Sequence, residues 1–185
     1  AYQGFGDGLE EDAAVVRLFA SLGLTMLVSS SFSKSFSLYG ERVGALTLVA
    51  GSQDEKDRVL SQLKRVIRTN YSNPPTHGGT IVASVLNSPE LYALWVEELA
   101  EMRNRIRAMR QQLVEKLKAR GVAQDFDFVL AQRGMFSYSG LTAEQVDRLR
   151  NEHSVYAVSS GRICVAALNS RNIDYVADAI AQVIA

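Results

Sequence analysis

Apolar and polar residues alternate in two different rhythms along the beginning of the chain. Within residues 9–22 the apolar side chains recur every three or four positions behind an acidic first turn, which predicts a helix. Short apolar runs at 24–30 and 42–50 are each typical of a buried strand. Because helix and strand patterns alternate, this part of the chain predicts a layered α/β fold.

Further helical patterns follow, and the last of them is unusually long. An apolar stripe over 53–68 predicts a helix that must end before Pro74 and Pro75, because proline disfavours helix ahead of it. After a short helix near 79–86, helical spacing runs unbroken over about 89–120, between a Ser-Pro start and a glycine stop. We expect this long helix to join two domains.

The remaining residues alternate short helices and strands. Thr142 and Gln145 form a capping-box pattern, which predicts a helix start. Residues 155–158 and 163–168 are strand candidates, and the apolar spacing over 173–183 predicts an amphipathic C-terminal helix. This half of the chain therefore predicts short elements of both kinds.

Composition and charge argue against several classes of partner. The 185 residues are 47% hydrophobic, and their 20 basic side chains are balanced by 20 acidic ones, which does not favour a nucleic-acid surface. The basic residues of the long helical pattern have acidic neighbours, so we expect them on a solvated helix surface: Arg103, Arg105, Arg107 and Arg110. No apolar run reaches the roughly 18 residues of a membrane span.

Cysteine and histidine offer no metal site, and the start of the chain is unusual. Cys164 is the only cysteine, so no internal disulfide is expected, which fits a reducing compartment such as the cytoplasm. His77 and His153 lie far apart in sequence, and we expect no bound metal. The chain opens at Ala1 without a methionine, so we expect that it begins within a longer protein.

Candidate chemistry concentrates in a polar segment that follows the first predicted strand. Residues 29–37 place several serines around Lys34, and Arg42 follows closely. Ligands gather at strand ends in open α/β sheets, and hydroxyls with a guanidinium suit a phosphate. A lysine in a dry site can also attack carbonyls. On composition alone, a solvated serine loop with an ordinary lysine is the simpler interpretation. A nucleotide P-loop is a poor match, because no glycine lies between Leu24 and Lys34.

The sequence around the lysine resembles a known signature. Residues 31–44 resemble the pyridoxal-5′-phosphate (PLP) lysine signature of class I aminotransferases, in which Ser-x-Ser-Lys is followed by Tyr-x-Glu-Arg-x-Gly. Residues 1–5 resemble the family's segment with the cofactor-contacting tyrosine, and 67–75 the interface loop of the aspartate and aromatic subgroup. Residues 159–163 resemble the segment with the carboxylate-binding arginine. The resemblance covers essentially the whole chain and implies the C-terminal half of such an enzyme.

That resemblance implies a fold and a reaction. The fold would be the PLP-dependent transferase fold type I, an α/β fold in which residues 1–101 are the C-terminal part of a large PLP-binding domain with a mainly parallel sheet. Residues 102–185 would form a small α+β C-terminal domain, joined to the first by the helix of about 89–120. The reaction would move an amino group from an aromatic or acidic L-amino acid to a 2-oxo acid, with 2-oxoglutarate as the expected acceptor.

Residues that match the family's motifs are assigned roles by the resemblance. Lys34 would form the Schiff base with PLP and would carry the proton between the substrate α-carbon and the cofactor. Tyr2 would hydrogen-bond the phenolic oxygen of the cofactor. The phosphate would be held by Ser31, Ser33 and Arg42. In this scheme PLP supplies the electron sink and the protein supplies orientation and charge.

Two further arginines would bind the substrate, because a guanidinium offers the bidentate geometry that suits a carboxylate. Arg162 would bind the α-carboxylate. Arg68 would cross the interface of a homodimer to the side-chain carboxylate of a dicarboxylic substrate in the neighbouring subunit. The active sites would therefore be shared between two subunits of a cytoplasmic enzyme.

One departure from the family pattern and several rival functions accompany this assignment. The carboxylate that pairs with the pyridine nitrogen would fall before Ala1, so we expect the 185 residues alone to be inactive and to expose apolar sheet surface. Another reaction of fold type I, such as that of a lyase, decarboxylase or synthase, would use similar residues. The remaining alternatives are a non-catalytic effector domain on this fold and a phosphate-ligand binding domain without a Schiff base.

Overall fold

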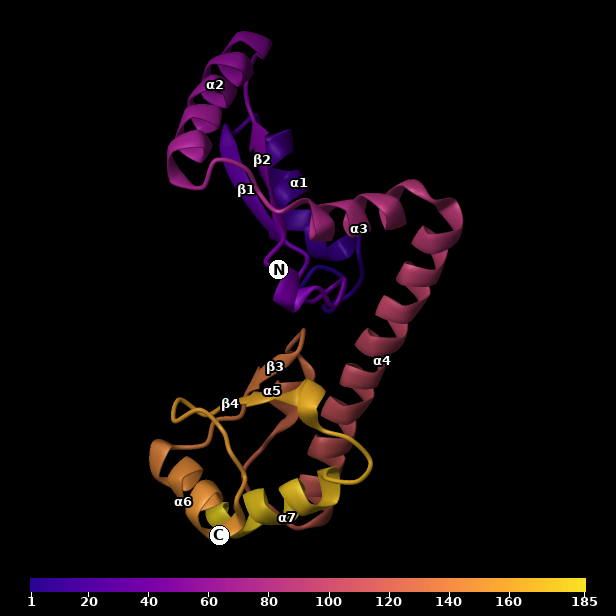
Figure 1. Ribbon diagram of the computed structural model, residues 1–185. Helices are drawn as coiled ribbons and strands as arrows, with labels where there is room; N and C mark the ends of the chain where they lie inside the picture. The colour runs from indigo at the N-terminus through magenta and orange to yellow at the C-terminus, as the bar shows by residue number, and fades with distance from the viewer. The chain divides into compact units, whose positions relative to one another are not determined.

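A computed structural model describes all 185 residues and separates them into two compact units, Ala1–Ala100 and Glu101–Ala185. The elements of the first unit, whose α-helices and strands are labelled in Figure 1, run in chain order: η1 Glu11–Ala13, α1 Ala14–Ser21, β1 Met26–Ser31, η2 Tyr39–Glu41, β2 Gly44–Val49, α2 Gln53–Asn70, α3 Thr76–Asn87 and the beginning of α4 Pro89–Ala119. The helices predicted at 53–68 and 89–120 are therefore confirmed, and so is the break between α2 and α3.

The two strands of the first unit form an antiparallel pair. Their register runs from Met26 opposite Val49 to Ser31 opposite Gly44. The mainly parallel sheet that we expected is thus not what these residues form. A parallel pair needs a crossover that carries the chain back to the starting edge, usually through a helix, whereas an open loop is enough to join antiparallel strands. The connection over 32–43 is such a loop and contains only the short turn η2.

Helix α2 shows how the local sequence sets the ends of an element. The hydroxyl of Ser52 accepts a hydrogen bond of 3.2 Å from the backbone N–H of Glu55, which caps the first turn. At the other end, Tyr71 and Ser72 donate to the carbonyl of Ile67, and the chain then leaves the helix toward the two prolines. The exposed face of the helix is strongly charged, as its amphipathic pattern predicts.

The first unit buries little of its apolar surface. Its buried apolar side chains are Phe5, Val82 and Leu99. Helices α1 and α2 contain no fully buried residue, and every residue of β2 is exposed or half-buried. The large apolar side chains that remain exposed in or next to α1, α2 and the two strands include Val15, Leu18, Phe19, Leu22, Leu27, Leu46, Leu60 and Val66. Leu27 and Leu46 lie on the paired strands, so the exposed apolar sheet surface that we expected of the 185 residues is present.

The second unit combines the rest of α4 with short helices and a small sheet. Its elements are α5 Asp127–Leu130, β3 Phe136–Tyr138, α6 Ala143–His153, β4 Arg162–Cys164, η3 Val165–Ala167 and α7 Ile173–Ile184. Strands β3 and β4 pair antiparallel, with Phe136 opposite Cys164 and Tyr138 opposite Arg162. The predicted capping box at the start of α6 is confirmed, because both of its reciprocal hydrogen bonds are present.

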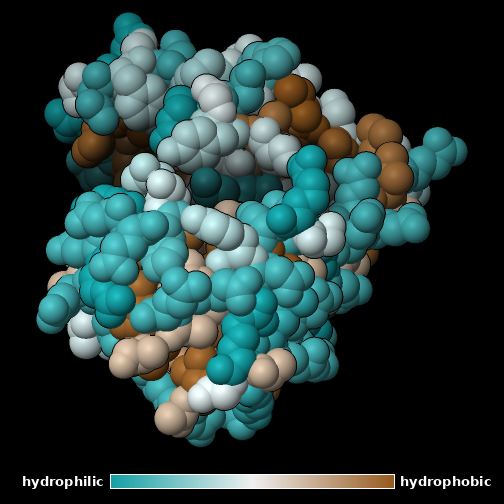
Figure 2. Space-filling view, turned by 90° about the horizontal axis from the view of Figure 1, so that it is seen from below, coloured by the Kyte–Doolittle hydropathy of each residue, from teal (hydrophilic) through white to brown (hydrophobic).

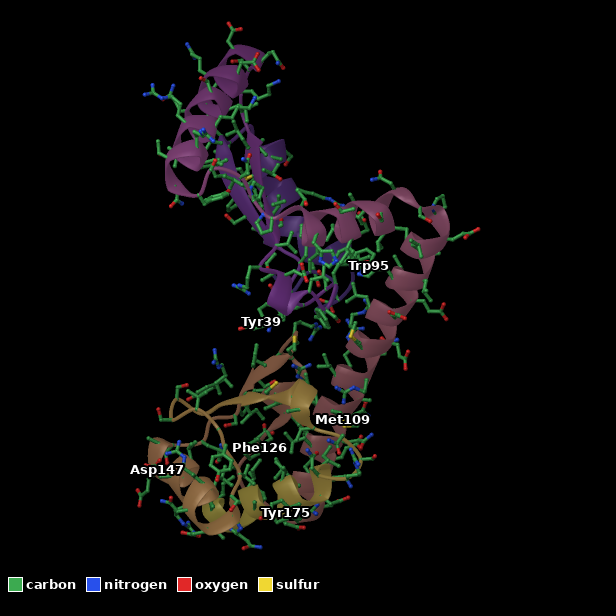
Figure 3. All side chains as sticks on the ribbon, viewed as in Figure 1. Tyr39, Trp95, Met109, Phe126, Asp147 and Tyr175 are labelled. Atoms are coloured by element: carbon green, nitrogen blue, oxygen red, sulfur yellow. The ribbon has the colours of Figure 1, made fainter.

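A continuous apolar core holds the second unit together. Figure 3 shows Met109 on α4 and Phe126 before α5, and both are buried. The largest fully buried side chains of the unit come from four helices and the turn after β4: Leu113, Leu117, Val129, Leu149, Val165, Ile173 and Ile180. Burying a side chain of this kind stabilises a fold by about 1.5–3 kcal/mol before the entropy of ordering is subtracted.

One arginine of α4 departs from the solvated surface that we expected. Arg110 is only 3% exposed, and its guanidinium donates to the Gly134 carbonyl at 2.6 Å and to the Ser137 hydroxyl at 3.2 Å. Burial lowers the pKa of the Arg110 guanidinium, and the nearby charges of Arg133 and Arg107 act in the same direction. The expectation is therefore wrong for Arg110, because loop carbonyls replace the water that a surface arginine would bind.

Two strand predictions in the second unit also need correction. Residues 155–158 form no strand, because Ser154 turns left-handed at the end of α6 and Val155 donates back to the helix. The strand predicted at 163–168 is shorter and begins one residue earlier. It ends at Cys164, since the N–H groups of Val165 and Ala166 both donate to the carbonyl of Met135 and wind the chain into η3.

The surface of the protein is mixed in character. Figure 2 shows apolar side chains that interrupt a predominantly polar face. None of the helices combines the length and the apolar composition needed to cross a membrane.

Candidate active site

The loop that joins β1 to β2 carries the polar cluster singled out from the sequence. Ser31 closes β1, and its hydroxyl lies 3.1 Å from the hydroxyl of Ser33. The backbone N–H of Ser33 also donates to the Ser31 hydroxyl, at 3.3 Å. Both serines are half-buried. The strand end therefore presents two hydroxyls side by side, which suits an anionic group with several acceptor oxygens.

Lys34 and Arg42 meet at one aromatic ring. The Lys34 amine lies 4.3 Å from the centroid of the Tyr39 ring, and the guanidinium carbon of Arg42 lies 5.3 Å from the same centroid. Arg42 also donates to the Tyr39 carbonyl at 3.0 Å. Tyr39, labelled in Figure 3, keeps 62% of its surface exposed. The lysine amine has no carboxylate partner, and it lies with a second cation at the same ring.

The backbone of this loop adopts an uncommon conformation at two positions. Ser37 has a φ of 55° and Arg42 has a φ of 54°. Both values lie in the left-handed region, which residues other than glycine rarely adopt. Such strain costs of order 1–3 kcal/mol and persists only where the surroundings hold it, often at functional sites. Arg42 is thus placed at the end of η2 by a backbone that glycine would adopt more easily.

Aromatic packing fixes the other side of the loop. The indole N–H of Trp95, on α4, donates to the Ser35 carbonyl at 2.6 Å. The Trp95 ring stacks on Phe36 with centroids 4.6 Å apart, and Phe36 meets Phe32 edge-on at 5.4 Å. A hollow of about 260 Å³ opens beside this packing, lined in part by Ser30, Ser31, Phe32, Tyr92 and Trp95.

Tyr2 belongs to a tight turn at the start of the chain. Its carbonyl accepts from the backbone N–H of Phe5 at 3.0 Å, and Gly4 supplies the positive φ of 92° that the turn requires. The Phe5 side chain is buried, whereas Tyr2 is 39% exposed. The glycine-rich loop that follows folds around the carboxylate of Asp12, which accepts from Gly4, Gly6, Asp7 and Gly8.

The two arginines expected to bind substrate lie apart from this loop in the sequence. Arg68 is exposed near the end of α2, and its guanidinium donates to the Ser72 hydroxyl at 2.6 Å. Arg162 begins β4 in the second unit, where its guanidinium carbon lies 5.0 Å from the centroid of the Phe136 ring. Among the predicted site residues, the structure places Ser31 beside Ser33. It also places Lys34 and Arg42 at the same Tyr39 ring.

Comparison with protein families identifies the family of the chain. A family model described as aminotransferase class I and II matches residues 1–180. The chain belongs to this aminotransferase family. The family resemblance predicted from the four sequence segments is therefore confirmed.

Curated members of the aminotransferase family match the chain from end to end. An aspartate aminotransferase of Pseudomonas aeruginosa is 70% identical over 184 residues, which is 100% of this chain and 46% of the relative. An aromatic-amino-acid aminotransferase of Escherichia coli is 56% identical over 183 residues, which is 99% of this chain and 46% of the relative. The chain thus spans about half the length of the relatives that it matches.

Solved aminotransferase structures show the same fold. The aromatic-amino-acid aminotransferase of Burkholderia pseudomallei, described as covalently bound to pyridoxal phosphate, superposes with a TM-score of 0.98 at 72% identity. The match covers 100% of this chain and 46% of that structure. A mitochondrial aspartate aminotransferase of Trypanosoma brucei superposes with a TM-score of 0.96 at 45% identity, over 99% of this chain and 48% of that one. The fold type I class predicted from the resemblance is confirmed at this level.

Two residues that contact the Lys34 loop were not predicted from the sequence as contributors to the site. Tyr39 was part of the quoted signature, yet its place under both cations could not be anticipated, because a left-handed turn brings Arg42 back over the ring. Trp95 lies far along the chain from Ser35, and helical periodicity alone assigns it to a helix without indicating this contact. The one signal in the sequence that singled out Trp95 was that it is the only tryptophan.

Proposed function

We propose that this chain forms part of a PLP-dependent aminotransferase. The enzyme would transfer an amino group from an aromatic or acidic L-amino acid to a 2-oxo acid, with 2-oxoglutarate as acceptor. The observation that carries the proposal is the loop after β1, where the Lys34 amine and the Arg42 guanidinium lie over one ring at a strand end that also presents paired hydroxyls. The aspartate and aromatic-amino-acid aminotransferases among its relatives support the choice of reaction.

The groups of this loop fit the cofactor. Ser31, Ser33 and Arg42 offer two hydroxyls and a guanidinium, which are the donors that a phosphate needs. Lys34 offers an amine without a carboxylate partner. This amine is therefore available to form a covalent link to an aldehyde. When bound, PLP supplies the electron sink for chemistry at the substrate α-carbon.

The side chains of this chain would bind, orient and move a proton. The Lys34 amine would move the proton between the substrate α-carbon and the cofactor, because it would be the basic group next to the reacting atoms. Tyr2 would donate its hydroxyl to the phenolic oxygen of the cofactor. Tyr39 would hold the Lys34 amine and Arg42 in their relative positions through its ring.

Substrate carboxylates would be bound by the two remaining arginines. Arg162 would bind the α-carboxylate through its paired N–H groups, and β4 with the Phe136 ring supports its guanidinium. Arg68 would reach the side-chain carboxylate of a dicarboxylic substrate across a homodimer interface, for which its exposed position near the end of α2 is suitable. Both active sites of the dimer would then contain residues of both subunits.

We further propose that residues 1–101 belong to the large PLP-binding domain and residues 102–185 to the small α+β domain of a cytoplasmic enzyme. The boundary between the two compact units falls within α4, which supports this assignment.

Covalent labelling of the complete protein tests the proposed function. The protein is incubated with PLP, reduced with borohydride and digested, and the peptides are analysed by mass spectrometry. We expect one pyridoxyl adduct on Lys34, because the hydroxyls of Ser31 and Ser33 and the guanidinium of Arg42 beside it would hold the phosphate of PLP. Lys34→Ala should lose the adduct, and Lys56→Ala should keep it. An adduct on another lysine, or none, would refute the proposal.

A further inference from the structure

The loop over residues 4–8 is organised by one carboxylate. The Asp12 Oδ2 atom accepts from the backbone N–H groups of Gly4 at 2.7 Å and Gly6 at 2.9 Å. Its Oδ1 atom accepts from Asp7 at 2.8 Å and from Gly8 at 3.5 Å. The backbone N–H of Asp12 in turn donates to the Gly8 carbonyl at 3.1 Å. Consecutive N–H groups aimed at one anion form a concave nest, here filled by the protein's own side chain.

Two glycines of the loop leave no room for a side chain next to this carboxylate or next to the neighbouring leucine. A side chain at Gly6 would place its first carbon 2.5 Å from Asp12 Oδ1. On another side, a side chain at Gly4 would place its first carbon 2.4 Å from the end of Leu99, which is itself completely buried. The glycines are therefore needed for close approach, and the loop is enclosed between a charged group and a packed leucine.

The same hydrogen bonds lock the carboxylate in its charged form. Burial would by itself raise the pKa of Asp12, but the N–H donors of Asp7, Gly6, Gly4 and Gly8 lower it below its ordinary value. Asp12 is thus a permanent anion near neutral pH.

The carboxylate is connected to Tyr2 through a single turn. Gly4, whose N–H reaches Asp12, is the third residue of the turn in which the Phe5 N–H donates to the Tyr2 carbonyl. The buried Phe5 ring fixes the end of that turn. Because Gly4 must keep its positive φ for the turn to close, a displaced Gly4 would also displace the backbone of Tyr2.

We infer that Asp12 is a positioning residue that holds the Tyr2 hydroxyl at the cofactor by fixing the backbone of the 2–8 segment. The inference rests on the proposed function, since it gives a catalytic meaning to the position of Tyr2. The alternative is a purely structural role, in which Asp12 only closes the turn ahead of α1.

The test uses the complete protein loaded with PLP and the variant Asp12→Asn, which removes the charge at nearly constant size. Glu11→Gln is the matched control, because it removes an equal charge from the same short helix η1 at a side chain that holds no backbone N–H. Two quantities are measured: the hydrogen exchange of the Gly4, Gly6 and Asp7 amides, and the absorbance of bound PLP as a function of pH.

We expect Asp12→Asn to speed exchange of these amides by about tenfold or more, because charge-assisted hydrogen bonds are lost. It should also move the midpoint of the PLP absorbance titration upward by about 1 pH unit, since the hydrogen bond from Tyr2 favours the unprotonated chromophore. Tyr2→Phe should give a similar shift, and the double variant Tyr2→Phe/Asp12→Asn should add little to it, as expected for two residues that act through one contact. Glu11→Gln should leave both measurements unchanged.

The outcomes separate the inference from the proposed function. Faster amide exchange with an unmoved titration would overturn the positioning role and leave Asp12 purely structural. A shift that adds fully to that of Tyr2→Phe would overturn it as well. Should Asp12→Asn fail to fold, Gly6→Ala displaces the carboxylate while keeping its charge, and must shift the titration in the same direction. Wild-type protein that shows no titrating PLP absorbance would instead refute the proposed function itself.

Discussion

The two units of this chain solve the problem of stability in different ways. The second unit surrounds its own core with four helices and a small sheet, and buried apolar side chains come from all four of these helices. The first unit has regular helices and a paired sheet, yet it buries only three apolar side chains fully, Phe5, Val82 and Leu99. Regular secondary structure is therefore no measure of independent stability, which depends on how much apolar surface an element can cover.

The candidate chemistry follows the same division. Lys34, Ser31, Ser33 and Arg42 lie on a strained loop of the unit that has little core of its own. That loop is held by specific polar and aromatic contacts, such as the bond from Trp95 to Ser35, in place of bulk burial. A loop held this way can present its side chains outward, which a loop packed into a core cannot do.

Separating the two units should produce the largest effect. Residues 89–185 alone should unfold cooperatively in urea, because their core lies within that segment. Residues 1–100 alone should show no cooperative transition and should bind an apolar dye, because their apolar side chains remain exposed. Circular dichroism and dye fluorescence measure both. A sharp transition in residues 1–100 would break the comparison.

Truncation of one leucine in each unit should give the next largest difference. Leu113→Ala should lower the free energy of unfolding by about 2–5 kcal/mol, because it opens a cavity in a closed core. Leu46→Ala, at a side chain that is 50% exposed in β2, should change it by less than about 1 kcal/mol. Urea unfolding of the 185-residue chain gives both values, and equal losses would show that the first unit is packed as tightly as the second.

A polar test within the second unit should give a smaller change. Arg110→Met should lower the free energy of unfolding by about 2 kcal/mol, because the Gly134 carbonyl and the Ser137 hydroxyl lose their buried donor. Arg150→Met is the control, since Arg150 is exposed and pairs only with Asp147, and it should change the stability by less than about 0.5 kcal/mol. Loss of stability by the control alone would contradict the role of the buried guanidinium.

The smallest effect should be a dependence on pH in the first unit. The pKa of Asp12 is lowered in the folded chain, so its stabilisation is complete above the ordinary value of about 3.9 and is lost as the pH falls through the lower folded value. The NMR signals of the Gly4 and Gly6 amides should therefore titrate with a midpoint below about 3.9. In Asp12→Asn the same signals should show no such midpoint. A midpoint at or above the ordinary value would mean that the N–H groups do not stabilise the anion.

Local patterns were sufficient for the long elements and insufficient for the short ones. Helix α4 and the capping box of α6 follow from periodicity, prolines, glycines and one Thr–Gln pair, all readable within a few residues. Strand β3 has three residues and exists only because β4 lies beside it, so no pattern of its own could reveal it. The same holds for the absence of a strand at 155–158, which depends on the left-handed Ser154.

The site divides in a similar way. The signature around Lys34 indicated the right segment because its residue types and spacing are specific, and the family match confirms the resemblance. The contacts of Tyr39, Trp95 and Asp12 arise from turns and from packing between distant residues, which a linear pattern does not contain. Arg110 shows the limit most clearly, because its acidic sequence neighbours suggested solvent while loop carbonyls bury it.

The indole of Trp95 gives this chain a built-in optical probe. It is the only tryptophan among the 185 residues. It stacks on Phe36, and it donates a hydrogen bond to the carbonyl of Ser35, the residue after Lys34. We therefore expect its emission to respond to events in the lysine loop, and this chain has no second indole that would contribute to the signal. Quenching or a colour shift of that emission would report occupancy of the loop without any label.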